Sequence, residues 1–127
     1  MMFNNKNSQN NFESIKRINT ILYCRNWETT VRFYRDTLKF SVNHETEWFV
    51  EFHLTGNTYL SIADASFTSI KSAGGDGITL SWQVEDIEFV HRWLQEAGVK
   101  TSQIKTIWGA LSFYFFDPEG HRIEIWT

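Results

Sequence analysis

The residues of this chain that could do chemistry are most concentrated in its last strand-like segment, HRIEIW. Side chains alternate along a strand, so Arg122, Glu124 and Trp126 are predicted to share one face. A buried carboxylate is unfavourable unless another group neutralises it or hydrogen-bonds it. Glu124 could therefore form an internal ion pair with Arg122 or a hydrogen bond with Tyr23, or it could anchor a cationic ligand.

Aromatic and polar side chains from other segments are predicted to lie on the same inward side as Glu124. If the turn before the last strand pairs Phe116 with His121, then Phe113 and Phe115 join Glu124 there. The other inward-facing residues, by the same alternation, are Asn19, Ile21, Tyr23, Tyr59, Ser61, Ala63, Thr79, Ser81 and Gln83. Aromatic surfaces with a few hydrogen-bonding groups are typical of a small-molecule site. Polar groups on inward faces need a ligand or water as partner, which favours a cavity.

The hairpin around Gly56 decides which residues of the preceding strand face this cavity. If two residues form the turn, Phe52 shares a face with Ser61; if three residues do, Glu51 and His53 share it instead. We expect the two-residue turn and include Phe52 in the candidate ligand site. The other register would bring Glu51 and His53 close to the carboxylate of the last strand and allow a metal or acid–base site.

Tryptophans are abundant, with 6 Trp and 11 Phe in a chain whose aromatic content is 17%. Most of these rings must form a core of large residues. Trp27, Trp82 and Trp93 fall on helix or helix-facing positions and are predicted to be core. Trp48 and Trp108 precede or open strands in equivalent parts of the chain, and either a flat ligand or core or dimer packing could use them.

The elements that must position these side chains occur twice in the same order. RINTILYC reads as a strand, Asn26 as a helix N-cap, and WFVEFHL and TYLSIA as two further strands; GITLSWQV, Asp86, ALSFYFF and HRIEIW repeat the pattern. The two N-caps lie at positions 26 and 86, a repeat of 60 residues. We therefore predict an α+β fold of two tandem β-α-β-β-β units, at about 17–65 and 77–127, with curved sheets around a cavity and helices on the outer face.

Length and charge limit the kind of protein this can be. A chain of 127 residues supports one domain, which we place at 17–127 behind a flexible arm at 1–16. With 12 Lys and Arg against 15 Asp and Glu, the net charge of −3 argues against a nucleic acid partner. Cys24 stands alone and is predicted to be a buried apolar side chain. No segment has the apolar length of a membrane span or the core of a signal peptide, so we expect no membrane partner and a cytoplasmic location.

Three segments in this order, FYRDTLKF, WQVEDIEFVHRWLQEAGV and FYFFDPEGHRIEIW, resemble the vicinal oxygen chelate superfamily. This group includes glyoxalase I, extradiol dioxygenases, fosfomycin-resistance enzymes and bleomycin-resistance proteins, and the resemblance spans about residues 17–127. In metal-dependent members, four side chains from four strands hold one divalent ion. The resemblance puts these positions at Asn19, Ser61, Thr79 and Glu124, of which only Glu124 is a credible ligand.

The resemblance therefore implies a protein similar to the bleomycin-resistance branch. Such a protein would bind and sequester a small aromatic molecule, including a cationic one, as in antibiotic resistance, without catalytic residues, cofactor or metal, and as a homodimer. One alternative is a metal-dependent glyoxalase, dioxygenase or transferase that uses Glu124 with His53 and Glu51. Another is a ligand-free interaction or regulatory module. His44, His91 and His121 are predicted to have surface or structural roles.

Overall fold

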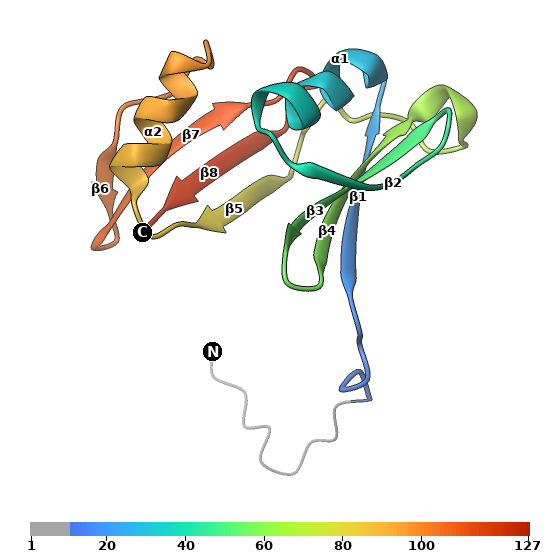
Figure 1. The fold of residues 1–127 in the computed structure, drawn as a ribbon, viewed down its shortest axis with the longest axis horizontal. Coiled ribbons are helices and arrows are strands. Elements are labelled where there is room, and N and C mark those ends of the chain that lie inside the picture. Colours follow the sequence, from blue (N-terminus) through green and yellow to red (C-terminus); the bar gives the residue numbers. More distant parts are fainter. Residues whose placement is uncertain (1–10) are drawn as a thin grey trace.

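The computed structural model describes residues 11–127 and consists of two β-α-β-β-β units that follow each other along the chain (Figure 1). The first unit contains β1 (Ile18–Cys24), α1 (Trp27–Arg32), the helical turn η1 (Phe33–Thr37), β2 (Ser41–Glu45), β3 (Phe49–Thr55), β4 (Thr58–Asp64) and the short turn η2 (Ala65–Phe67). The second contains β5 (Thr79–Gln83), α2 (Ile87–Glu96), β6 (Lys105–Ile107), β7 (Ala110–Phe116) and β8 (Arg122–Trp126). Most of the predicted N-terminal arm, residues 1–10, lies outside the described residues.

Each unit forms its own four-stranded mixed sheet. The strand order is β1-β4-β3-β2 in the first sheet and β5-β8-β7-β6 in the second, and in each the first strand of the unit runs parallel to the last. The predicted duplication and the α+β fold class are therefore confirmed. The two sheets share no strand pairing and do not close around a cavity. Within residues 11–127, no helix has the length and apolar character needed to cross a membrane.

The two helices begin differently, although both start where the sequence predicts. The side chain of Asp86 caps α2 by accepting a hydrogen bond from the Phe89 N–H at 3.0 Å. The side chain of Asn26 makes no such bond. Instead the backbone N–H groups of Arg25 and Asn26 donate to the carboxylate of Glu119, at 2.8 and 2.9 Å. A turn of the second unit therefore holds the start of α1.

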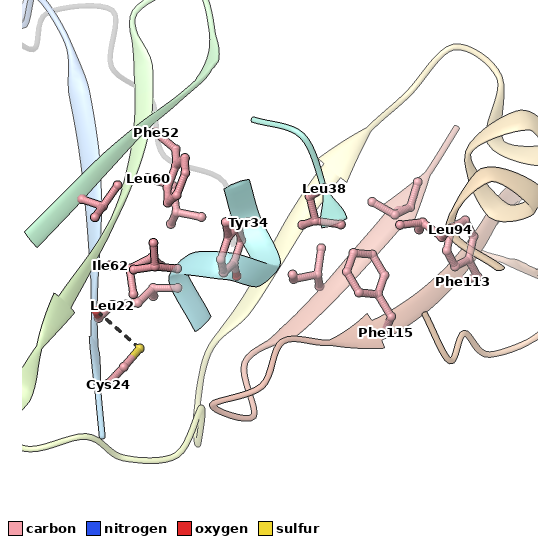
Figure 2. Packing of buried hydrophobic residues seen from close by; sticks show 14 of the residues in the cluster. Leu22, Cys24, Tyr34, Leu38, Phe52, Leu60, Ile62, Leu94, Phe113 and Phe115 are labelled. Carbon is pink, nitrogen blue, oxygen red and sulfur yellow. Dashed lines mark hydrogen bonds between the residues drawn. The ribbon is translucent and has the colours of Figure 1, made fainter. Parts of the chain in front are cut away.

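The first helix lies between the two sheets and packs against both (Figure 2). The ring of Tyr34 lies 6.0 Å from the ring of Phe52 in the first sheet. The neighbouring ring of Phe33 lies 6.2 Å from Phe115 in the second sheet. In η1 the helix widens into a π-type turn, which is consistent with this double contact. The two units therefore share one hydrophobic core, and each sheet has a second face, turned away from that core, which we call its open face.

The registers of both hairpins differ by one residue from our expectation. Between β3 and β4, Thr55 pairs with Thr58 across a two-residue turn, as expected, but a bulge between His53 and Thr55 shifts the pairing. Glu51 consequently pairs with Ser61. The expected two-residue turn is therefore present. The prediction that Phe52 shares a face with Ser61 is nevertheless wrong, because the extra residue in the bulge shifts the register by one residue, as a three-residue turn would have done.

Between β7 and β8, Phe116 pairs with Arg122 and not with His121. The Asp117 N–H donates to the His121 carbonyl at 3.0 Å, which leaves three residues in the loop. The side chain of Asp117 accepts from the backbone N–H groups of Glu119, Gly120 and His121 and tightens this loop. A one-residue change of register moves every side chain of β7 to the other face.

Candidate functional site

The open face of the first sheet is organised around Glu51, which is only 6% exposed. Its carboxylate accepts hydrogen bonds from Arg17 at 2.8 Å, from the Asn43 amide at 2.8 Å and from the Asn19 amide at 3.3 Å. Burial by itself would raise the pKa of Glu51, but the hydrogen bonds from Arg17 and Asn43 and the Arg17 charge hold the pKa below its ordinary value. Glu51 is therefore ionised at neutral pH and paired.

Neighbouring residues complete this cluster. The Ser61 hydroxyl donates to the Asn19 carbonyl oxygen at 2.8 Å. The Arg17 guanidinium lies 3.8 Å from the centre of the Tyr59 ring, a cation–π contact. The His53 ring lies 5.3 Å from Tyr59 and hydrogen-bonds through Nε2 to the Gly56 carbonyl. The polar groups of this face mostly satisfy one another, so a ligand would have to displace an existing partner such as Arg17.

The open face of the second sheet carries Glu124 in a different environment. Glu124 accepts one hydrogen bond, from the Ser81 hydroxyl at 2.9 Å, and pairs across the strands with Tyr114. Among residues 11–127 it forms no ion pair. Neither of the internal partners considered from the sequence, Arg122 and Tyr23, is bonded to it. Thr79, Gln83 and Trp126 share this face by the strand alternation.

Arg122 lies on the same open face and contacts an aromatic ring. Its guanidinium carbon is 4.4 Å from the centre of the Tyr114 ring. Within the described part of the chain Arg122 has no carboxylate partner, and its Nε atom is buried without a hydrogen bond. The second sheet thus presents one carboxylate and one guanidinium that are not paired with each other.

Three aromatic residues predicted for the ligand site lie in the core. Phe52, Phe113 and Phe115 are 0%, 1% and 2% exposed and face the helices, so their predicted placement on the inward face is wrong. The cause is the register shift in each hairpin. Tyr114 and Phe116 take the positions expected for Phe113 and Phe115 and are exposed. Counting back from Arg122 with a three-residue loop would have identified them.

The remaining predicted residues are divided between the faces and the edges. Asn19, Ile21, Tyr23, Tyr59 and Ser61 lie on the open face of the first sheet, as the alternation predicts. Trp48 is half-buried, and its ring stacks on Phe67 with 6.4 Å between centroids. Trp108 is 99% exposed, at the tip of the β6–β7 hairpin. Trp48 and Trp108 are thus in very different surroundings, although they occupy equivalent parts of the sequence.

A groove of about 510 Å³ runs between the two sheets. Its lining residues come from β1, β3, β4, β5 and the segment after η1: Thr20, Phe40, Leu54, Thr55, Thr58, Ser81, Trp82, Gln83 and Val84. The rings of Phe40 and Trp82 meet edge to face, with 5.6 Å between centroids. Trp82 was predicted to be core and does pack against it, but its ring also lines this groove.

The residues at the four superfamily metal positions do not fit a transition metal. Asn19 and Ser61 are hydrogen-bonded to each other, and Glu124 is the single carboxylate of the four. Neutral hydroxyl and amide oxygens bind such ions weakly. Nor is the alternative set of Glu51, His53 and Glu124 brought together, since residues 11–127 contain no cluster of three or more His, Cys, Asp or Glu side chains able to hold an ion.

The other histidines have the surface or structural positions predicted for them. His44 is exposed on β2. His91 hydrogen-bonds through Nε2 to the Ser102 carbonyl at 2.9 Å. His121 is buried, and its Nδ1 lies 2.8 Å from an Asp117 oxygen.

The repeated β-α-β-β-β units and their open faces define a class of proteins, and sequence comparison gives the same class. Residues 14–125 match the Glyoxalase/Bleomycin resistance protein/Dioxygenase superfamily, and the chain therefore belongs to it. A glyoxalase family protein from Enterococcus faecalis has a similar structure, with 27% identity, 91% of this chain and 98% of that chain covered, and a TM-score of 0.69.

Two further structures have the same fold at lower identity. One is a glyoxalase/bleomycin resistance protein/dioxygenase from Nocardioides, at 19% identity and TM-score 0.73, covering 91% of this chain and 86% of that chain. The other is named lactoylglutathione lyase, from Agrobacterium tumefaciens, at 20% identity and TM-score 0.69, covering 90% and 92%. A search of curated protein sequences found no significant match.

Proposed function

We propose that this chain binds a small, flat aromatic molecule without transforming it, and that Glu124 anchors a positive charge on that molecule. The observation that carries the proposal is the state of Glu124. Among residues 11–127, a Ser81 hydroxyl is the only partner of this half-buried carboxylate, which pairs across the strands with the exposed Tyr114. A ligand cation that displaces Arg122 from the Tyr114 ring would bind the carboxylate and the ring together.

The donor set on the open faces supports binding without metal chemistry. Asn19, Ser61 and Thr79 supply neutral oxygens, and the polar cluster around Glu51 is already internally bonded. The chain has the superfamily fold but lacks metal-ligating side chains at three of the four superfamily positions. This combination favours sequestration, as in the bleomycin-resistance proteins, over a lyase or dioxygenase reaction.

We further propose that two copies of the chain associate through their open faces. Tyr114 and Phe116 are exposed on the second sheet and Ile21 on the first, and a second copy could cover such apolar side chains and complete a cleft. Sedimentation equilibrium would give the mass of a dimer for the wild type and of a monomer for Phe116→Lys. A monomeric wild type at concentrations of about 100 µM would contradict this part of the proposal.

The binding proposal is tested with acridine orange, a flat aromatic cation, by the quenching of tryptophan fluorescence. We expect saturable quenching at micromolar concentrations and about tenfold weaker binding to Glu124→Gln, since a charge-assisted contact is lost. Glu96→Gln, which removes an exposed carboxylate from α2, is the matched control and should bind like the wild type. Absence of saturation, or equal affinity of Glu124→Gln and wild type, would contradict the proposal.

A further inference from the structure

A second pocket lies on the open face of the second sheet, toward its outer strands. Its volume is about 350 Å³, and it is lined by Ser102, Gln103, Lys105, Ile107, Ser112, Phe113, Tyr114 and Arg122. Glu124 does not line it. Strand pairing brings the lining side chains to one face. Lys105 pairs with Ser112 on β7, and Tyr114 lies two residues further along the same strand.

Of the residues that the structure describes, two cations and no carboxylate line this pocket. Neither Lys105 nor Arg122 forms an ion pair within residues 11–127. The chain as a whole is acidic, with a net charge of −3, so this local excess of positive charge is not a general property of its surface. An anion would be attracted here by both charges.

Arg122 is positioned to hydrogen-bond an anion as well as to attract it by its charge. Its guanidinium carbon lies 4.4 Å from the centre of the Tyr114 ring, and this contact holds the plane of the guanidinium group. Its Nε is the only buried side-chain N or O atom without a hydrogen-bond partner in the part of the chain that the structure describes. Buried polar groups of folded proteins nearly always have a partner, so a water molecule or an acceptor group of a ligand is expected next to Nε.

The remaining walls indicate the class of anion. Ile107 and Tyr114 supply apolar surface next to the cations. The Ser102 hydroxyl is already used, because it accepts from the Tyr114 N–H at 2.8 Å. A planar carboxylate matches the guanidinium fork, and an apolar or aromatic body matches the neighbouring side chains.

We propose that this pocket binds the carboxylate of a small aromatic or apolar acid, with Arg122 as the bidentate donor and Lys105 as the second cation. The site shares the Tyr114 ring with that of Glu124, but its charged side chains and the charge of its ligand differ. Benzoate binding that depends on Arg122 therefore tests this proposal separately from the binding of an aromatic cation, which depends on Glu124.

The test is a titration of the full chain, labelled with ¹⁵N, with sodium benzoate at low ionic strength. We expect saturable shifts of the Arg122 Nε–H and of the Ser112 and Tyr114 amides. Benzyl alcohol, which keeps the ring and lacks the charge, should produce no saturable shifts of these signals. No saturation with benzoate up to about 50 mM would overturn the proposal, because one paired charge and an apolar contact should bind more tightly than that. Inorganic phosphate binding as tightly as benzoate would overturn the assigned class of ligand.

Variants distinguish benzoate binding in this pocket from a general effect of surface charge. Arg122→Gln should weaken benzoate binding about tenfold and Arg122→Lys by less, because lysine keeps the charge and loses the fork. Lys105→Gln changes an exposed side chain, so it keeps the test decisive even if Arg122→Gln does not fold; it should weaken binding severalfold. Arg92→Gln, at an exposed position of α2, is the control. Equal weakening by Arg92→Gln, or none by Lys105→Gln and Arg122→Lys, would overturn the site.

Discussion

The hydroxyl of Tyr34 donates a hydrogen bond of 2.8 Å to the carboxylate of Asp117, which is 83 residues away along the chain. Both residues are buried. Tyr34 belongs to the helical segment of the first unit and Asp117 to the β7–β8 loop of the second. The same carboxylate oxygen also lies 2.8 Å from Nδ1 of His121. This contact, together with Glu119 at the start of α1, fixes one unit against the other.

The first prediction concerns this bond. Tyr34→Phe keeps the buried ring and removes the donor, so it should lower the free energy of unfolding by about 1–3 kcal/mol. Urea denaturation followed by circular dichroism measures the change. Tyr23→Phe, on the open face of the first sheet, is the matched control and should change stability by less than about 0.5 kcal/mol. An unfolding free energy for Tyr34→Phe equal to that of the wild type would show that this bond adds no net stability to the contact between the units.

A second prediction concerns the close approach of the segment before β5 to the same loop. Gly75 has a φ of +87°, and a Cβ at this position would meet the backbone of Gly120 and His121. Gly75→Ala should therefore destabilise the fold by about 2–4 kcal/mol. Gly56 also has a positive φ, but a Cβ there would meet nothing, so Gly56→Ala should cost about 1 kcal/mol. Similar losses in the two variants would contradict the predicted collision.

Cys24 provides a third prediction. Burial, followed by the charges of Glu119 and Asp117, raises the pKa of the Cys24 thiol to about 12. The folded chain should therefore leave a thiol reagent such as DTNB unreacted at pH 8, and the unfolded chain in guanidinium should react at once. Because the folded pKa is the higher one, the stability contributed by this thiol is complete below pH 9.0 and is lost as pH rises toward 12. Rapid labelling of the folded chain would contradict the burial of this side chain.

The fourth prediction is the behaviour of Glu51 in acid. Its pKa lies below the ordinary value of 4.5, because the bonds from Arg17 and Asn43 outweigh the opposing effect of burial. A lowered folded pKa contributes stability above the unfolded value and loses it as pH falls through the folded one. Glu51→Gln should therefore show a smaller fall in unfolding free energy than the wild type between about pH 5 and pH 3.

The exposed Glu47→Gln is the control for this experiment and should follow the wild-type curve. The unfolding free energy of Glu51→Gln will still fall in acid, because the pKa of Glu119 is also lowered. Burial opposes this lowering, but hydrogen bonds from the Arg25 N–H, Ser72 and the Asn26 N–H outweigh it. Parallel curves for Glu51→Gln and wild type would mean that Glu51 is not held as an ion in the folded state.

The repeat could be predicted from the sequence because its signals are local. The helix caps at Asn26 and Asp86, and the alternation of apolar residues in TYLSIA and HRIEIW, need only a few neighbouring residues to be recognised. The assignment of faces failed because it depended on one residue at each hairpin. The bulge at His53 to Thr55, and the loop tightened by Asp117, each changed the register.

The partners of the charged residues could not be predicted from the sequence for a different reason. Glu51 is neutralised by Arg17, 34 residues away, and accepts a hydrogen bond from Asn43 on a neighbouring strand. Such contacts depend on the register and twist of the sheet, which no local pattern in the sequence reports. Arg17 and Asn43 were therefore missing from the predicted site, although both bind Glu51 on the open face of the first sheet.

We propose that this superfamily member does not chelate a metal and binds its ligand through side chains alone. Elemental analysis of the purified, untagged chain tests it directly, after exposure to zinc, nickel, manganese and iron(II) and then desalting. We expect each metal to remain far below one ion per chain and Glu124→Gln to give the same values. About one tightly held ion per chain, lost in Glu124→Gln, would contradict this proposal and identify Glu124 as a metal ligand.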